Sequence, residues 1–279
     1  MKIADISVYQ GNINWELARK ELDLVIFRAS VGNNADTKYI KNATGCGIPF
    51  GVYHYFKAGT AEEAEKEAKF FYECATKNEL QPLFFCPDIE YKTQTSKTTL
   101  EVCESILNTL RELGTKKVGI YIGQSRYSYM KSIKDKFDFI WIPRYGQNTG
   151  EANEKYAPKY YCDLWQYTSN GHIEGISSRV DLNKIYGNKD LNWFLGKYEI
   201  ESPLKRSLFY LLREKVRKGS EGEAVRELQL TLNSYGYLCG RQDGVFDDQT
   251  DKAVRAFQKD YGLTVDGICG PKTVQKLIG

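Results

Sequence analysis

The sequence predicts an α/β barrel followed by a small all-α domain. Its 279 residues are too many for one small domain and suit a barrel-sized domain plus a short module. Short apolar runs alternate with helix-like segments up to about residue 187, and the pattern is helical from about Ser207. We therefore place the barrel at residues 1–196, a linker at 197–206 and the helical domain at 207–279.

Eight short runs rich in β-branched and aromatic residues predict buried strands. They are Ile3–Tyr9, Leu24–Ser30, Phe50–Phe56, Leu83–Glu90, Lys117–Gly123, Phe139–Tyr145, Cys162–Thr168 and Val180–Ile185. Eight strands are enough to close a barrel.

The longer intervals between the early runs predict helices. Thr60 with Glu63, and Thr98 with Glu101, fit capping boxes, and Gly114 ends the second helix. The apolar stripes of these helices are Ala64, Ala68, Phe71 and Ala75, and then Cys103, Ile106, Leu107 and Leu110. Apolar strands that alternate with helices predict a parallel sheet covered by helices.

Helical signals weaken after the fifth run, so we expect the barrel to finish with strands alone. Ser125–Ile133 predicts one short helix, and Asp190–Lys197 predicts a last one. A break between the two domains is expected at residues 201–203, which include a proline.

The helical domain contains an internal repeat. Asp243 and Gly244 begin a segment that recurs 23 residues later, at Asp266 and Gly267. Each copy predicts an Asp-Gly turn followed by a short amphipathic helix. With the helix that precedes them, the two copies complete a three-helix module.

Charge and composition argue against several classes of protein. The net charge is +3 and no long Lys/Arg run occurs, so a nucleic-acid partner is not expected. No apolar stretch of about 20 residues could span a membrane, and residues 1–5 begin no signal peptide. We therefore expect synthesis in the cytoplasm. The 20 Tyr, 13 Phe and 4 Trp suit either a core or a sugar-binding groove.

Seven cysteines and two histidines offer little support for a metal site. No C-x-x-C motif occurs, and we expect neither a metal nor a cofactor. Seven cysteines cannot all pair internally, and reduced, mostly buried thiols are the simpler interpretation. A bridge between Cys239 and Cys269 stays open.

Two candidate acids lie at the end of the fourth predicted strand. Asp88 and Glu90 come after the apolar residues 83–86 and, being two apart on a strand, should share a face. Two carboxyl groups forced together separate their pKa values, which leaves one protonated and one ionised. Glycoside hydrolysis needs that combination. The alternative is a pair on a solvated surface, because short motifs of this kind are common.

Two further acids lie in the first and last predicted strands, which are neighbours in a closed barrel. They are Asp5 and Asp181. Working residues of a parallel barrel lie at the carboxyl ends of its strands, so four acids could converge there. Taken singly, each could instead be a helix cap or a turn residue.

Motifs across nearly all of residues 3–187 resemble those of family 25 lysozymes and occur in the same order. They are Asp5-Ile6-Ser7-Val8-Tyr9-Gln10-Gly11 with Ile13-Asn14-Trp15, Gly51-Val52-Tyr53-His54-Tyr55-Phe56, Asp88-Ile89-Glu90, Trp141-Ile142 with Tyr145, Leu164-Trp165-Gln166-Tyr167, Gly175-Ile176 and Val180-Asp181-Leu182-Asn183.

This resemblance implies an irregular, TIM-like (β/α)5(β)3 barrel that hydrolyses the β-1,4 bond between N-acetylmuramic acid and N-acetylglucosamine. It implies that Glu90 is the general acid and that Asp88 holds or polarises the 2-acetamido group of the substrate. Asp5 and Asp181 complete the acidic cluster. The groove residues that it implies are Tyr9, Tyr53, Tyr145, Trp165 and Gln166.

Two prolines depart from the family pattern. Pro87 precedes the acidic pair, where a proline predicts a bulge or a bent strand end, and Pro143 replaces a usual small residue. The stereochemical outcome stays open among retention with a protein nucleophile, inversion and assistance by the acetamido group. We favour assistance because the D-x-E pair resembles that of enzymes that use it.

The helical domain resembles the small peptidoglycan-binding domain of wall hydrolases. The residues that carry this resemblance are Arg217–Gly222, Val225–Gln229, Asp243–Phe246, Thr250, Ala253-Val254, Phe257-Gln258, Val265–Gly267 and Gly270-Pro271. A helical spacer without a ligand is the alternative. Attachment to the wall would concentrate an enzyme on an insoluble polymer.

We therefore expect an N-acetylmuramidase whose partner is bacterial peptidoglycan, such as a phage or prophage endolysin released through a holin pore. A spore or autolytic muramidase of the host is one alternative. A catalytically silent glycan-binding protein is another, against which the intact Asp88–Glu90 pair argues. A chitinase-like hydrolase is a third, but the additional acids of its motif are absent near Phe85 and Cys86.

Overall fold

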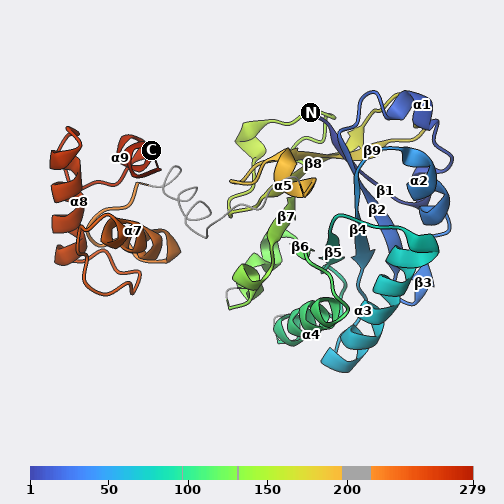
Figure 1. Ribbon diagram of the computed structural model, residues 1–279, viewed down its shortest axis with the longest axis horizontal. Helices are drawn as coiled ribbons and strands as arrows, with labels where there is room; N and C mark the ends of the chain where they lie inside the picture. The colour runs from blue at the N-terminus through green and yellow to red at the C-terminus, as the bar shows by residue number, and fades with distance from the viewer. Residues whose placement is uncertain (96, 131, 197–214, 279) are drawn as a thin grey trace. The chain divides into compact units, whose positions relative to one another are not determined.

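The computed structural model describes residues 1–95, 97–130, 132–196 and 215–278 (Figure 1). The chain divides into two compact units, Met1–Tyr198 and Glu199–Gly279. The expected linker at 197–206 lies outside the described residues, as does the expected break within it.

Each of the eight predicted runs contains a strand. The barrel strands are β1 (Ile3–Ile6), β2 (Leu24–Val31), β4 (Phe50–Tyr55), β5 (Phe85–Asp88), β6 (Gly119–Tyr121), β7 (Phe139–Pro143), β8 (Leu164–Gly171) and β9 (Val180–Ile185). A two-residue strand, β3 (Asn34–Ala35), pairs with the end of β2.

The barrel closes through β9, which lies between β8 and β1. It is antiparallel to both of these strands, whereas β1, β2 and β4 to β8 are parallel to their other barrel neighbours. The first residues of β9 therefore lie at the same end of the barrel as the carboxyl ends of the other strands.

Helices cover the outside of the first half of the barrel. They are α1 (Trp15–Ala18), α2 (Tyr39–Cys46), α3 (Ala61–Thr76) and α4 (Thr99–Glu112), and α5 (Leu191–Phe194) follows the last strand. Figure 1 shows α3 and α4 side by side. Short 3-10 helices are η1 (Val8–Gln10), η2 (Lys77–Glu79), η3 (Gln124–Met130), η4 (Lys134–Lys136) and η5 (Glu154–Tyr156). The predicted short helix at Ser125–Ile133 is thus a 3-10 segment.

The predicted apolar stripes of α3 and α4 are buried, but only one of the two predicted caps is formed. The Thr60 side chain accepts a hydrogen bond from the Glu63 N–H at 3.3 Å. Thr98 makes no such cap, so that prediction is wrong. Its backbone is already helical, and its hydroxyl donates to the Thr93 carbonyl instead.

An aromatic cluster fills the barrel near the amino ends of the strands. The Phe194 ring of α5 lies 5.7 Å from that of Phe84 and 5.2 Å from that of Phe139, measured between centroids. Gly51 and Gly119 leave room for these rings, because a Cβ atom there would come within 2.2 and 2.1 Å of them. This packing leaves the carboxyl ends of the strands to form a site.

All seven cysteines are free and buried, so the alternative bridge between Cys239 and Cys269 is not formed. Both of these thiols belong to the core of the helical unit. None of the helices in the described ranges is both long enough and apolar enough to cross a lipid bilayer.

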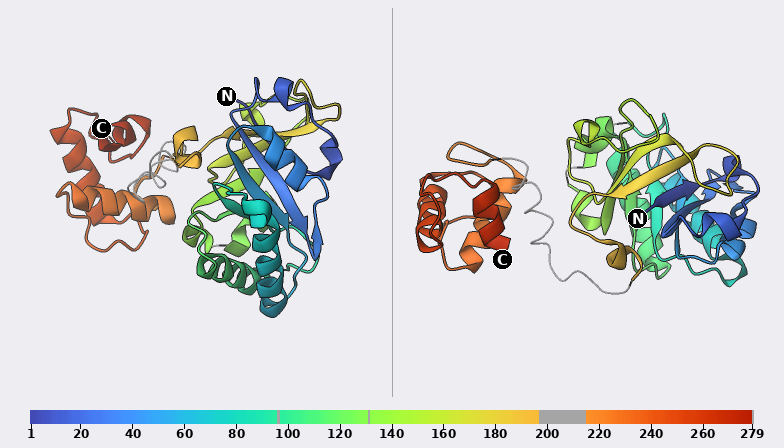
Figure 2. Two further views of the ribbon diagram at one scale, coloured as in Figure 1. Left: turned by 45° about the vertical axis from the view of Figure 1, so that its right-hand side comes forward. Right: turned by 90° about the horizontal axis from the view of Figure 1, so that it is seen from above.

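The described part of the second unit contains α7 (Glu223–Ser234), α8 (Asp248–Asp260) and α9 (Pro271–Ile278), which Figure 2 shows from two further sides. The side-chain amide of Gln229 holds the first Asp-Gly turn by accepting from the Gly244 N–H and donating to the Val245 carbonyl. Gln258 makes the same contacts with Gly267 and Ile268. The sequence repeat is therefore also a structural repeat.

Candidate active site

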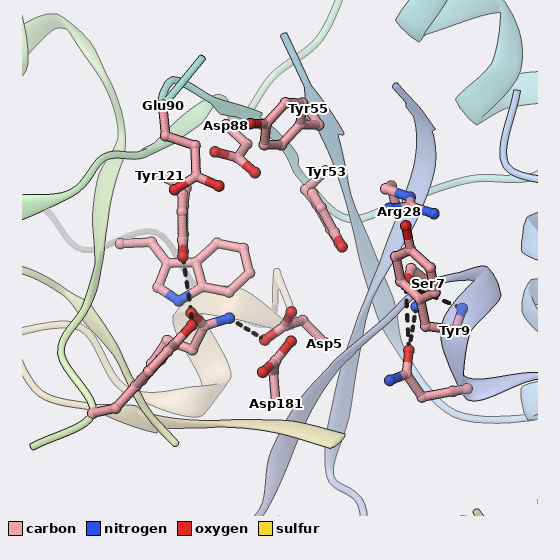
Figure 3. Close-up of a pocket in the computed structure, with 14 residues that line it drawn as sticks. Asp5, Ser7, Tyr9, Arg28, Tyr53, Tyr55, Asp88, Glu90, Tyr121 and Asp181 are labelled. Carbon is pink, nitrogen blue, oxygen red and sulfur yellow. Dashed lines mark hydrogen bonds between the residues drawn. The ribbon is translucent and has the colours of Figure 1, made fainter. Parts of the chain in front are cut away.

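A pocket lies at the carboxyl ends of the barrel strands (Figure 3). All four predicted acids line it, and β1, β5 and β9 position three of them. The complete lining is Asp5, Ser7, Tyr9, Gln10, Arg28, Tyr53, Tyr55, Asp88, Glu90, Tyr121, Trp141, Tyr145, Gln166 and Asp181.

Asp5 and Asp181 face each other across the β1–β9 ladder, where they are register partners. Burial raises the pKa of Asp5 to about 6, and burial together with the Asp5 charge raises the pKa of Asp181 to about 8. Asp5 Oδ2 also accepts hydrogen bonds from Gln166 and Asn183, both at 2.9 Å. Because two carboxyl groups this close do not both ionise readily, the pair shares one proton, and the two amide donors favour the negative charge on Asp5.

A hydrogen-bond network fixes the two amides that hold Asp5. The Gln166 Oε1 atom accepts from the hydroxyls of Tyr121 at 2.9 Å and Tyr145 at 2.7 Å. The indole N–H of Trp141 donates to Asn183 Oδ1 at 2.8 Å. Because both amide oxygens are occupied, both amide N–H groups point at the carboxylate.

Asp88 is the last residue of β5, and its side chain is buried. Its Oδ1 atom has no hydrogen-bond partner in the described part of the chain. Burial raises the pKa of Asp88 well above its ordinary value, and the nearby charges of Glu90 and Asp5 raise it further. A buried carboxyl oxygen without a partner is costly to the fold, which is typical of a residue that serves function more than stability.

Glu90 lies two residues beyond the end of β5 and reaches the pocket with an exposed side chain. The strand alternation continues this far, because Ile89 between the two acids is fully buried and its N–H donates to the Tyr121 carbonyl. Although the side chain is accessible, the pocket walls remove part of the solvent around its carboxyl group, which raises the pKa of Glu90, and the Arg126 charge opposes that rise.

Pro87 does not produce the predicted bulge. Its pairing with His54 continues the β4–β5 register without a shift. On the side that faces β6, the N–H groups of Phe85 and Ile89 donate to backbone carbonyls. Pro87 lies between these two residues on the same side and has no N–H to donate. The proline removes one possible ladder bond and, among the described residues, leaves only the Phe85–Val118 and Asp88–Tyr121 pairs toward β6, but the register does not shift.

Four of the five predicted groove residues line the pocket. Tyr53, Tyr145 and Gln166 form its walls, and Tyr9 is 77% exposed at its rim. His54 next to Tyr53 points the other way and is fully buried, as the alternation along a strand requires.

Trp165 is the exception, and its predicted place in the groove is wrong. The indole is 1% exposed and donates to the Arg144 carbonyl at 2.8 Å. Its ring packs on Tyr186 at 5.4 Å. Since Gln166 points into the barrel, the neighbouring Trp165 must point away from it.

Six lining residues were not among the predicted site residues: Ser7, Gln10, Arg28, Tyr55, Tyr121 and Trp141. The sequence could have indicated Arg28, because it is the only charged residue of the mostly apolar strand β2. Among the described residues, no group of three or more His, Cys, Asp or Glu side chains is placed to hold a metal ion.

Comparisons with known proteins agree with this architecture. A similar solved structure is a glycosyl hydrolase 25 of Streptococcus pneumoniae, with a TM-score of 0.64 and 28% identity over 72% of this chain and 93% of that one. Another is the catalytic domain of endolysin ply40 from bacteriophage P40 of Listeria monocytogenes, with a TM-score of 0.58 and 29% identity, which covers 67% of this chain and 93% of that one.

Curated relatives match in two ways. The autolytic lysozyme of Clostridium acetobutylicum is 23% identical over 285 residues, which cover 98% of this chain and 77% of that protein. The spore cortex-lytic enzyme of Bacillus cereus is 46% identical over 63 residues, or 23% of this chain. The chain spans only 24% of the length of that enzyme.

Two family models match separate parts of the chain. A peptidoglycan binding domain model matches residues 221–277, which hold α7, α8 and α9. The model of glycosyl hydrolases family 25 matches residues 4–176, which hold all of the barrel strands except β9 and the first residue of β1. The chain, with its four-carboxyl pocket, therefore belongs to glycosyl hydrolases family 25.

Proposed function

We propose that the protein is an N-acetylmuramidase, a lysozyme that hydrolyses the β-1,4 bond between N-acetylmuramic acid and N-acetylglucosamine in bacterial peptidoglycan. The observation that carries this proposal is the pocket with four carboxyl groups, all of raised pKa. Such a site can offer a protonated acid and a negative charge at neutral pH, as glycoside hydrolysis requires.

Glu90 is the general acid in this proposal. Its side chain is the most accessible of the Asp88–Glu90 pair, so it can reach a glycosidic oxygen. Its raised pKa keeps the proton available. The Glu90 proton passes to the leaving oxygen as the bond from that oxygen to C1 breaks, and the sugar that carries C1 gains oxocarbenium character.

Asp88 acts on the 2-acetamido group of that sugar. Its carboxyl group, which lines the pocket, accepts the acetamide N–H, and this makes the acetamide carbonyl oxygen a better nucleophile toward C1. The cyclic oxazolinium that forms is opened by water, whose proton returns to Glu90. Two displacements at C1 give retention of configuration. The Asp5 carboxylate, held by Gln166 and Asn183, adds negative charge near the reacting centre.

The helical unit is proposed to hold the enzyme on peptidoglycan. Its support is the family match at residues 221–277. Attachment raises the local concentration of the barrel on the polymer without adding contacts to the pocket. Co-sedimentation of the full-length Glu90→Gln variant with purified walls tests this role separately from cleavage.

The setting in which the enzyme acts is a further part of the proposal. We infer a phage or prophage endolysin that reaches the wall after release through a holin-type pore, in keeping with the similar endolysin domain. A host autolysin, like the lysozyme of Clostridium acetobutylicum, is the alternative. A holin gene beside the coding sequence would favour the endolysin, and a set of bacterial sporulation or division genes would favour the autolysin.

The muramidase assignment is tested by the sugar at the new reducing end. Purified peptidoglycan is digested, reduced with borohydride and hydrolysed, and the amino-sugar alcohols are identified. We expect muramitol. Glucosaminitol would instead indicate a glucosaminidase, and the absence of new reducing ends would indicate a glycan-binding protein without activity.

Arg126 is expected to set the alkaline limit of activity. It donates from Nη1 to the carbonyls of Tyr91 at 3.0 Å and Gln94 at 2.7 Å, just after Glu90. Its charge lowers the pKa of Glu90, so Arg126→Gln should raise that pKa and keep the acid protonated to higher pH. The alkaline limb of the kcat/KM profile should therefore move to higher pH. Arg126→Lys keeps the charge and should leave the limb in place; an equal movement in both variants would contradict the electrostatic explanation.

A further inference from the structure

Arg28 is the only basic side chain among the residues that line the acidic pocket. It lies on β2 and pairs with Tyr53 of β4 in the parallel ladder. Its side chain is 13% exposed, so the guanidinium is largely enclosed and still reaches the pocket. Figure 3 shows it beside Tyr9, away from Glu90.

Two neighbours hold the guanidinium in one orientation. Its Nε atom donates to Asp36 Oδ2 at 2.9 Å, and the Asp36 side chain is fully buried. Asp36 is itself fixed, because its carboxylate accepts the N–H groups of Val8 and Lys38, each at 2.9 Å. The Tyr9 ring lies 5.1 Å from the Arg28 Cζ atom, in cation–π contact.

The two terminal nitrogens of Arg28 are left for another group. Within the described ranges, Arg28 makes its only ion pair with Asp36, through Nε, and neither terminal nitrogen donates to a protein acceptor. These nitrogens are also absent from the buried polar atoms that have no partner, so they are in contact with the solvent of the pocket. Two parallel N–H groups on a planar fork match the two oxygens of a carboxylate.

We infer that Arg28, positioned by Asp36 and Tyr9, binds a carboxylate carried by the muramic acid part of the substrate. This inference rests on the proposed function. Muramic acid differs from N-acetylglucosamine by its 3-O-lactyl group, so a carboxylate site distinguishes peptidoglycan from neutral chitin. The carboxylate has two possible sources, the lactyl group of peptide-free glycan and an acidic residue of the stem peptide.

Three forms of one glycan separate these sources. They are peptide-free glycan strands, the same strands with the lactyl carboxyl converted to a methylamide, and intact peptidoglycan with its stem peptides. Wild type, Arg28→Gln, Arg28→Lys and the control Lys69→Gln are compared by kcat/KM from released reducing ends. Lys69 is an exposed cation of α3 outside the pocket, so its variant controls for general attraction to a polyanion.

If the lactyl carboxylate is bound, wild type should prefer the free acid over the methylamide by about tenfold or more, as for a charge-assisted hydrogen bond. Arg28→Gln should bring this ratio close to one, Arg28→Lys should give an intermediate ratio, and Lys69→Gln should keep the wild-type ratio. If a stem carboxylate is bound, wild type should cleave both peptide-free forms equally and prefer intact peptidoglycan, and Arg28→Gln should lose that preference.

One result overturns the inference while leaving the proposed function in place. In that result, Arg28→Gln loses the same factor of activity on all three substrates, so that every ratio stays at its wild-type value, as expected if Arg28 only supports the fold. A wild-type protein that releases no reducing ends from any of the three substrates would refute the proposed function itself.

Discussion

Glu90→Gln is expected to lower kcat by about 10²–10⁴-fold, the range for loss of a general acid. Glutamine keeps the size of the side chain but has no proton to give to the leaving oxygen. KM should change little, because Glu90 acts on the transition state more than on the bound substrate. The measurement is the initial rate of turbidity loss of purified walls together with reducing-end release.

Glu112→Gln is a suitable control for this variant. Glu112 is an exposed residue at the end of α4 and does not line the pocket, so its variant should clear walls at the wild-type rate. Equal clearing by the Glu90 variant and wild type would refute the assignment of the acid. In the wild type, activity should persist to higher pH than an ordinary glutamate allows, because burial raises the pKa of Glu90.

Asp88→Asn is expected to reduce kcat by about 10²–10³-fold, as for loss of one electrostatic stabiliser of the transition state. The amide has nearly the shape of the carboxyl group but cannot supply the negative charge that polarises the acetamido group. The assay is the same as for Glu90. Activity within a few-fold of wild type would show that Asp88 does not act on the substrate in the proposed way.

The same substitution should make the fold more stable at alkaline pH. Burial raises the pKa of Asp88 above its ordinary value of 3.8, so the folded protein holds this proton more tightly than the unfolded chain does. The stability that results is present at acidic pH and is lost as the pH rises through the raised pKa. The variant should thus match wild type near pH 4 and exceed it near pH 8 by about 1–3 kcal/mol, the cost of an unsatisfied buried group.

Urea unfolding at the two pH values measures this difference. The acidic measurement serves as the internal control, because the wild-type side chain is then uncharged. A variant that is less stable than wild type by the same amount at both pH values would indicate that packing around Asp88, and not its charge, decides the outcome. A gain in stability together with a loss of activity would be typical of a functional residue kept at a cost to the fold.

Local patterns were enough to predict much of the barrel and of its acids. Each predicted run contains a strand, since the runs are short, apolar and rich in β-branched residues. Asp88 lies near the end of such a run, where an acid is costly unless it is used. The approach of Asp5 to Asp181 was also predictable, because closure makes the first and last strands neighbours. The repeat of the helical unit is visible in its two Asp-Gly turns.

Other features depended on contacts between distant parts of the chain. The alternation of inward and outward side chains along a strand is the same whichever way the strand runs. The local pattern of β9 therefore could not reveal that this strand is antiparallel to β1 and β8. Trp165 and Gln166 lie in a strand with apolar residues on both faces, and only the closed barrel decided which of them points inward. The loss of the Thr98 cap likewise followed from a competing hydrogen bond to Thr93.

The sequence by itself therefore determined which segments form strands and which acids stand at their ends, because these depend on residue type and on spacings of a few residues. Only the tertiary structure decided how the side chains work together. Side-chain amides from β8 and β9 donate hydrogen bonds to the Asp5 carboxylate. Asp36 and Tyr9 fix the orientation of the Arg28 guanidinium. These side-chain orientations depend on partners that are far apart in the sequence, so a local sequence pattern does not predict them.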